Sequence, residues 1–264
     1  MPTYFDQLNR EVNLPQIPKR IISIVPSQTE LLFYLGLDEQ IIGITKFCIL
    51  PYDKVKSKVK TGGTKQLNIQ LIRELQPDLI IANKEENERS QVEELMGICP
   101  VWISDIDNLH DALNMIQSMG EMTGKGTEAD LLCNAISVAF NKLNKEILNL
   151  RVAYLIWRRP YMAAGTGTFI DSMLKLCGLT NAFDIDRYPE VSESMLINAK
   201  PDVVMLSSEP YPFNNKHMEE IKLLLPDTKV ILVDGEMFSW YGSRLLLAAD
   251  YFISLIKLLN EGKQ

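Results

Sequence analysis

The sequence runs through the same order of segments twice, and this internal duplication most constrains how the chain can fold. Each half carries an apolar run and a helix that ends in Gly-Leu, then a Pro-Asp pair before a second apolar run, and finally a short apolar run that closes on Asp. The matching segments are residues 20–26 and 151–157, 35–37 and 177–179, 71–81 and 195–205, and 101–105 and 230–234. The repeat predicts two similar lobes with a ligand cleft between them.

Within each half, apolar runs alternate with helical patterns, which predicts parallel sheets joined by right-handed crossovers. In the first half we expect strands at 20–25, 41–44, 79–82 and 101–103, and helices at 29–35, 68–76 and 90–96, the last capped by Ser90. In the second half we expect strands at 152–157, 203–206 and 230–233, and helices at 168–176, 192–199, 218–225 and 243–259. The predicted fold class is α/β, with two Rossmann-like parallel-sheet lobes.

The segment between the two copies predicts a single long helix. Its apolar residues are spaced by three or four, at Leu131, Leu132, Ala135, Ile136, Ala139, Leu143, Ile147 and Leu150. No proline or glycine interrupts residues 127–150, so we expect one amphipathic helix on the order of 35 Å long. The predicted domains are an N-terminal α/β lobe (1–122), a linking backbone helix (123–150) and a C-terminal α/β lobe (151–264).

Charge and hydropathy exclude several classes of function. The net charge of −7 does not suit a nucleic-acid partner, whose phosphates need a basic surface. No apolar run approaches the roughly 20 residues that span a bilayer, so we expect no membrane insertion. Residues 1–11 lack the basic start, apolar stretch and cleavage site of a secretory signal. This predicts a cytoplasmic protein, or a periplasmic one if its leader has been removed.

The sequence offers no recognisable catalytic or metal site. The two histidines, His110 and His217, are far apart, and no metalloprotease, nucleophile-elbow or zinc-type spacing occurs. Glu85, Glu86 and Glu209 are less suited to be paired carboxylates for acid/base catalysis, because they fall at equivalent strand ends of opposite lobes. We therefore predict that the chain is not an enzyme and has no catalytic residue, no metal ligands and no intrinsic cofactor.

The four cysteines are scattered, at Cys48, Cys99, Cys133 and Cys177, and no two form a Cys-x-x-Cys pair. This pattern predicts free thiols rather than a disulfide framework. We expect Cys48 to be a buried thiol, because a single cysteine without neighbouring ligands makes a poor metal site.

Aromatic and charged residues gather in the segments that follow predicted strands. Ligands of open parallel sheets bind beyond the carboxyl ends of the strands, so these segments are the candidate site. Amphipathic rings beside arginines suit a large planar or amide-bearing ligand. The predicted ligand-binding residues are Lys65, Glu85, Trp157, Arg158, Arg159, Tyr161, Glu209, Tyr211, Phe213, Trp240, Tyr241 and Arg244.

Three segments carry a family resemblance that covers nearly the whole chain. Residues 20–31 (RIISIVPSQTEL), 76–82 (QPDLIIA) and 242–249 (GSRLLLAA) resemble the helical-backbone class of substrate-binding proteins, whose members bind cobalamin, ferric siderophores or haem for ABC importers. A narrower similarity, to an uncharacterised branch of that class, rests on residues 46–48, 62–65, 83–87, 159–162, 209–213 and 240–242. The resemblance implies a monomeric, non-catalytic protein that binds a corrinoid or an iron chelate between its lobes, with little closure.

The same resemblance makes the permease partner less secure. Importer members offer one glutamate from each lobe to the permease, and the aligned positions here hold Gln70 and Ser194, with Glu74 and Glu193 nearby. Loss of one partner of a close interfacial charge pair costs about 2–5 kcal/mol. A cytosolic enzyme or sensor that handles a corrinoid or another cofactor precursor is therefore the alternative interpretation, and a protein-interaction module is the third.

Overall fold

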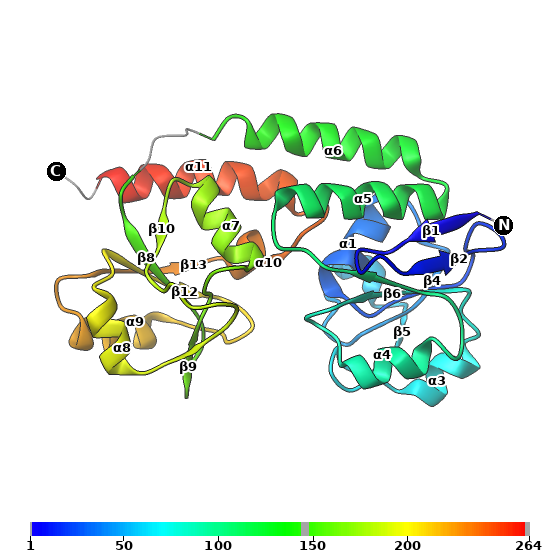
Figure 1. The fold of residues 1–264 in the computed structure, drawn as a ribbon, viewed down its shortest axis with the longest axis horizontal. Coiled ribbons are helices and arrows are strands. Elements are labelled where there is room, and N and C mark those ends of the chain that lie inside the picture. Colours follow the sequence, from blue (N-terminus) through cyan, green and yellow to red (C-terminus); the bar gives the residue numbers. More distant parts are fainter. Residues whose placement is uncertain (1, 144–147, 262–264) are drawn as a thin grey trace. The chain divides into compact units, whose positions relative to one another are not determined.

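The computed structural model describes residues 2–143 and 148–261, and these residues fold into two compact units (Figure 1). Unit 1 contains the chain up to Ile106, then His110–Ile136 and Trp240–Arg244. Unit 2 contains Asp107–Leu109, Ser137–Ser239 and the chain from Leu245 onward. Each unit has its own β-sheet, which confirms the two-lobed α/β class predicted from the repeat.

The sheet of unit 1 is entirely parallel and has the order β5-β4-β3-β6-β7. Its strands are β3 (Ile21–Ser23), β4 (Ile41–Ile44), β5 (Val59–Lys60), β6 (Leu79–Asn83) and β7 (Val101–Ser104). The residues of β3, β6 and β7 are all buried, as expected of strands covered on both faces. Four of these strands were predicted, whereas β5, with only two exposed residues, was not.

The helices of unit 1 follow its strands. They are α1 (Pro26–Tyr34), α2 (Tyr52–Val55), α3 (Ile69–Glu74), α4 (Arg89–Leu95) and α5 (Leu109–Thr123). The Asn68 side chain caps α3 by accepting a hydrogen bond from the Leu71 amide. The prediction that Ser90 caps α4 is wrong, because Glu88 holds the cap position and Ser90 lies in the first turn.

An N-terminal hairpin completes unit 1. Its strands, β1 (Thr3–Phe5) and β2 (Glu11–Asn13), pair with each other and with no other strand of the described chain. The hairpin is held against β7, because the Trp102 indole donates to the Phe5 carbonyl at 3.2 Å and the Gln7 amide donates to the Ile103 carbonyl at 3.1 Å.

The sheet of unit 2 repeats the parallel core of unit 1 and extends it. Its strands are β8 (Arg151–Trp157), β9 (Tyr161–Ala163), β10 (Thr180–Asn181), β11 (Glu190–Val191), β12 (Val203–Ser207) and β13 (Lys229–Val233). The parallel neighbours β10-β8-β12-β13 match β4-β3-β6-β7 of unit 1. The predicted parallel sheet is therefore present, and two short antiparallel strands that were not predicted, β9 and β11, extend it beside β8.

The helices of unit 2 are α7 (Phe169–Leu176), α8 (Glu193–Ala199), α9 (Asn215–Leu224), α10 (Gly235–Ser239) and α11 (Leu245–Asn260). The hydroxyls of Thr168 and Ser192 cap α7 and α8, at the predicted starting positions. The predicted helices of this half are all present, but α10 was not predicted.

A helix does link the two units, but it is shorter than predicted. This helix, α6 (Gly126–Phe140), begins in unit 1 and ends in unit 2. Fifteen residues give a length of about 22 Å rather than 35 Å. Residues 141–143 form a turn and 148–150 have no regular structure, while 144–147 lie outside the described residues. Of the periodic apolar residues beyond the helix, Leu143 is buried without being helical, and Ile147 lies outside the described residues.

Candidate functional site

In unit 2, the carboxyl end of β8 presents an indole ring on a support of other rings. Trp157 is the last residue of β8 and is 40% exposed. Its ring packs edge-on against Tyr211, with centroids 5.6 Å apart, and Tyr211 in turn packs against Phe213 at 4.8 Å. An aromatic face that is fixed from behind and open in front can bind a flat ligand at little cost in side-chain entropy.

Two arginines follow this indole directly. Arg158 is held by Glu220 at 2.6 Å, and its side chain is only 14% exposed. Partial burial opposes the charge of Arg158, but hydrogen bonds to Glu220, Tyr211 and Tyr161 outweigh it and raise the pKa of the guanidinium. The Nε atom of Arg158 is buried and has no hydrogen-bond partner. Arg159 is exposed, and among the described residues no acidic side chain pairs with it.

Both arginines line a hollow of 470 Å³ in unit 2. Its other lining residues are Pro160, Tyr161, Val191, Ser192, Glu193, Glu220 and Leu224. We call Trp157, Arg158, Arg159, Tyr161 and Tyr211 the β8 exit cluster. Four of these predicted ligand-binding residues lie within residues 157–161, and the structure brings the fifth, Tyr211, against them.

Two further predicted residues of unit 2 have structural roles. Phe213 is 6% exposed and belongs to the apolar core beneath the sheet. Glu209 follows β12 and accepts a hydrogen bond from the Ser239 hydroxyl at 2.5 Å, which ties the β12 exit to α10. Phe213 therefore supports the cluster from behind.

The last three predicted residues pack with unit 1. They lie in the segment Trp240–Arg244, whose flanking helices α10 and α11 belong to unit 2. Arg244 forms two hydrogen bonds with Glu30 of α1, at 2.6 and 3.1 Å, and stacks on Trp240. The Tyr241 hydroxyl donates to Glu86 at 2.9 Å. Trp240 and Tyr241 are 6% and 7% exposed, so this segment, the 240–244 strap, holds a position rather than presenting open side chains.

In unit 1, the predicted ligand-binding residues Lys65 and Glu85 lie side by side. The Lys65 ammonium donates to the Glu85 carbonyl at 2.7 Å. Asn83, the last residue of β6, shapes this exit because its side-chain oxygen accepts from the amides of Glu85 and Glu86 at 2.8 and 3.0 Å. The backbone after β6 is therefore held in a fixed turn.

The histidines and cysteines have structural environments. His217 completes the capping box of α9, whose cap residue is Asn214, and His110 contacts Asn114 on the surface of α5. All four cysteines are free thiols, and burial raises the pKa of the Cys177 thiol to about 12. Cys48 is buried between the hydroxyls of Thr29 and Thr45. Within residues 2–143 and 148–261, no group of three or more His, Cys, Asp or Glu side chains could hold a metal ion.

Sequence reasoning missed the carboxylates that position the arginines. Glu30 and Glu220 lie 214 and 62 positions from their partners Arg244 and Arg158, in helices whose acidic residues look like ordinary solvated surface. Tyr241–Glu86 is equally remote in sequence.

Comparison with known proteins identifies the family of this chain. The family described as periplasmic binding protein matches residues 21–224. The chain belongs to this family. A vitamin B12-binding protein of Pectobacterium carotovorum is 25% identical over 255 residues, which cover 93% of this chain and 91% of that relative. Family membership implies a small-molecule ligand and a permease partner, and it confirms the prediction of a binding protein rather than an enzyme.

Solved structures share the fold. A siderophore-binding protein, bound to a complex of two acinetobactin molecules and ferric iron, is similar with a TM-score of 0.78 and 19% identity, over 97% of this chain and 99% of that one. A periplasmic haem-binding protein of Vibrio cholerae is similar with a TM-score of 0.76 and 20% identity, over 90% and 98% of the two chains. These similarities confirm the predicted two-lobed α/β fold. Among the described helices, none has the length and apolar character to cross a membrane.

Proposed function

We propose that this chain is the substrate-binding protein of an ABC-type uptake system and that it takes up a metal chelate, either a corrinoid or an iron complex of siderophore or haem type. One observation carries the proposal: a fixed, exposed indole stands next to two arginines at the carboxyl end of β8. The indole would stack on the flat or apolar part of the ligand, and the arginines would bind its carboxylate, phosphate or amide oxygens.

The hollow beside the arginines supports the second half of this assignment. Ligand pockets of about 300–1,000 Å³ are typical of sites for small molecules. A hollow of 470 Å³ with two guanidinium groups suits a polar side group of a chelate better than a whole macrocycle. The ring system of the ligand would then lie outside the hollow, over Trp157.

The relatives favour the same class of ligand. Vitamin B12, haem and a ferric siderophore are named as ligands of similar proteins, and all three are metal chelates with polar groups at their periphery. Lys65 and Glu85 stay predicted ligand contacts. We leave Phe213, Trp240, Tyr241 and Arg244 out of the proposed contacts, because they are buried or already engaged.

Titration of the purified protein tests the proposal. We expect cyanocobalamin, cobinamide, haemin or a ferric siderophore to bind with a Kd below about 100 µM, measured by absorbance or calorimetry. Trp157→Ala should weaken the ligand that binds by about tenfold or more, whereas Tyr34→Ala, which removes a 53% exposed ring at the far end of α1, should change the Kd less than twofold. Failure of all four ligands to bind would refute the assignment.

A further inference from the structure

Unit 1 contains a second hollow that the proposed uptake function does not use. It has a volume of 390 Å³ and lies between the N-terminal hairpin, the ends of β6 and β7, and α4. Its lining residues are Leu8, Arg10, Asn83, Lys84, Asn87, Arg89, Val92, Glu93, Met96 and Ile103. None of these residues belongs to the β8 exit cluster, which lies in the other unit.

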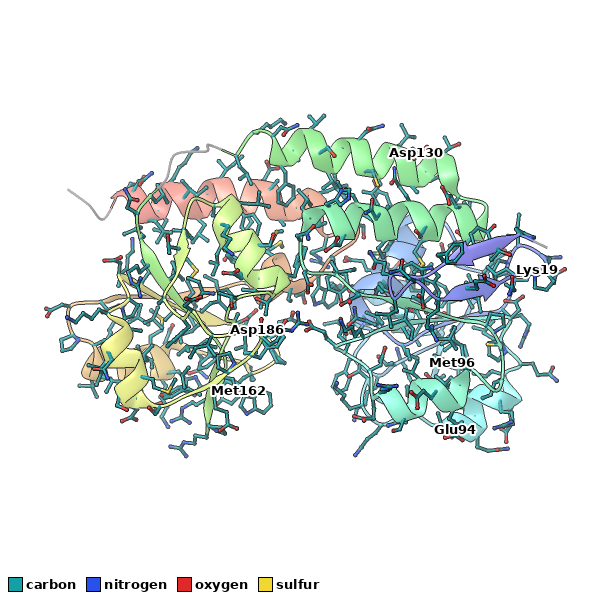
Figure 2. The ribbon with its side chains drawn as sticks, viewed as in Figure 1. Lys19, Glu94, Met96, Asp130, Met162 and Asp186 are labelled. Carbon is teal, nitrogen blue, oxygen red and sulfur yellow. The ribbon has the colours of Figure 1, made fainter. Side chains whose placement is uncertain are left out.

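The floor of this hollow is apolar. Leu8 comes from the hairpin, Val92 and Met96 come from α4 and its C-terminal cap, and Ile103 comes from β7. Val92 and Ile103 are buried in the core of the unit, whereas Met96 is 37% exposed at the end of α4 (Figure 2). A methionine side chain adapts easily to the shape of an apolar guest.

Three cations stand around this floor, with one anion among them. They are Arg10, Lys84 and Arg89, and the anion is Glu93, which binds Arg89 at 2.7 Å. Arg10 and Lys84 are paired with Asp6 and Asp105, but neither of these aspartates lines the hollow. Among the residues that line the hollow, three cations therefore stand against one anion.

One of these cations has a poor hydrogen-bond partner on the side of the hollow. The Nε and Nη2 atoms of Arg10 donate to Asp6, and Nη2 also donates to the Val101 carbonyl. Its Nη1 atom meets only the sulfur of Met96, at 3.0 Å. A thioether is a weak acceptor, whereas a carboxylate forms a strong, charge-assisted hydrogen bond with a guanidinium.

We infer that this hollow is a binding site for a small anionic amphiphile, a carboxylate that carries an alkyl chain or an aromatic ring. The carboxylate takes the Nη1 donor of Arg10 in place of the Met96 sulfur and lies close to Lys84. The apolar tail displaces water from Leu8, Val92 and Ile103. The volume lies within the range of about 300–1,000 Å³ that is typical of small-molecule sites.

Decanoate is the probe for this site, with decanol as its uncharged counterpart. By calorimetry, decanoate should bind the full chain at one site with a Kd below about 1 mM, and decanol should bind at least tenfold more weakly. Met96→Glu places a competing carboxylate beside Arg10, so it should weaken decanoate at least tenfold. Met195→Glu is the matched control, since Met195 is also 37% exposed but lies on α8 of unit 2.

Circular dichroism and the thermal midpoint establish that both variants are folded before they are titrated. The site is supported if Met96→Glu loses decanoate binding while Met195→Glu keeps it within twofold. It is overturned if the wild type shows no saturable binding, if decanol binds as well as decanoate, or if Met96→Glu binds like the control. The cobalamin, haemin and siderophore titrations are a separate test, because none of the proposed chelate contacts lines this hollow.

Discussion

His217 shows how one side chain can fix both a helix start and the support of a binding surface. Its Nδ1 atom accepts a hydrogen bond from the Asn214 amide at 3.0 Å, which completes the capping box of α9. Because Nδ1 is an acceptor, the proton of the neutral ring is on Nε2, which lies 3.3 Å from the Tyr211 hydroxyl. Tyr211 is the ring against which Trp157 packs.

The protonation of His217 should make the protein less stable in mild acid. Burial, followed by the positive charge of Arg158, lowers the pKa of His217. The unfolded chain therefore takes up a proton near pH 6.5, before the folded chain does. The contribution of neutral His217 to the free energy of unfolding is fully present above about pH 6.5. It is lost as the pH falls through the lower pKa that His217 has in the folded chain. Chemical denaturation between pH 8 and pH 5 measures this loss.

Two variants isolate this contribution. In His217→Gln, a glutamine at the third helical position can keep the capping box but does not titrate, so its stability should fall less between pH 7 and pH 5. His110→Gln removes the exposed histidine and should follow the wild type. If His217→Gln and wild type lose stability in parallel, His217 is not the titrating group.

At the scale of elements, the close approach of α5 and α6 depends on a missing side chain. The two helices lie side by side (Figure 1), and a Cβ atom at Gly120 of α5 would lie 2.4 Å from the Cβ of Ala129 in α6 and 2.9 Å from the Lys125 carbonyl. Neither neighbour can move without shifting a backbone. Glycine at this position is therefore a packing requirement rather than a helix breaker.

Gly120→Ala should destabilise unit 1, although alanine favours helices. Overpacking costs about 1–3 kcal/mol, which outweighs the gain of up to about 1 kcal/mol in helix propensity. Gly126→Ala is the control, because it also lies in a helix but nothing lies within 4 Å of its added Cβ. Thermal midpoints should fall for Gly120→Ala and stay level or rise for Gly126→Ala. Equal midpoints for the two variants would contradict the packing argument.

The elements that the sequence predicts best are the ones that depend on local pattern. Strands such as β6 and β12 are fully buried and apolar, so their composition alone identifies them. Strands β9 and β11 contain three and two residues, and they form only because they pair with each other and with β8. No local sequence pattern predicts such short strands, and none predicts the five-residue helix α10.

The dependence on local pattern also explains which site residues were predicted correctly and which were not. Trp157, Arg158 and Tyr161 follow or lie beside a long strand, so their position could be read from the sequence. Arg244 was expected beside them because it follows β13, but α10 intervenes and the chain then passes to unit 1. Which unit a loop packs against depends on distant partners such as Glu30, and these leave no trace in the local sequence.

At the scale of the whole molecule, the chain crosses between its units more often than a simple duplication requires. Besides the link through α6, the 240–244 strap returns to unit 1 between two helices of unit 2. The lobe boundaries predicted from the repeat differ from this division at the strap. The cytoplasmic or periplasmic location and the monomeric state stay predictions, as does weakened docking at Gln70 and Ser194.

The ion pair of the strap should contribute to the stability of the whole chain. The side chains of Arg244 and Glu30 are only 11% and 18% exposed, and they share two hydrogen bonds. Glu30→Gln should therefore cost about 3 kcal/mol, since it removes the negative charge that a largely buried guanidinium binds through two hydrogen bonds. Glu219→Gln is the control, because it breaks an exposed pair with Lys222 and should cost less than about 1 kcal/mol.

A double-mutant cycle separates this pair from the packing around it. Arg244→Met keeps much of the apolar stem of the side chain and removes its charge. In that background, Glu30→Gln no longer breaks an ion pair. We expect the two losses to be non-additive by about 2 kcal/mol in the free energy of unfolding by denaturant. Additive losses would mean that the packing of Trp240, Tyr241 and their neighbours holds the strap and that the ion pair contributes no coupling energy. A strong coupling energy would instead mean that the Arg244–Glu30 ion pair keeps the 240–244 strap packed on unit 1, although α10 and α11 on either side of it belong to unit 2.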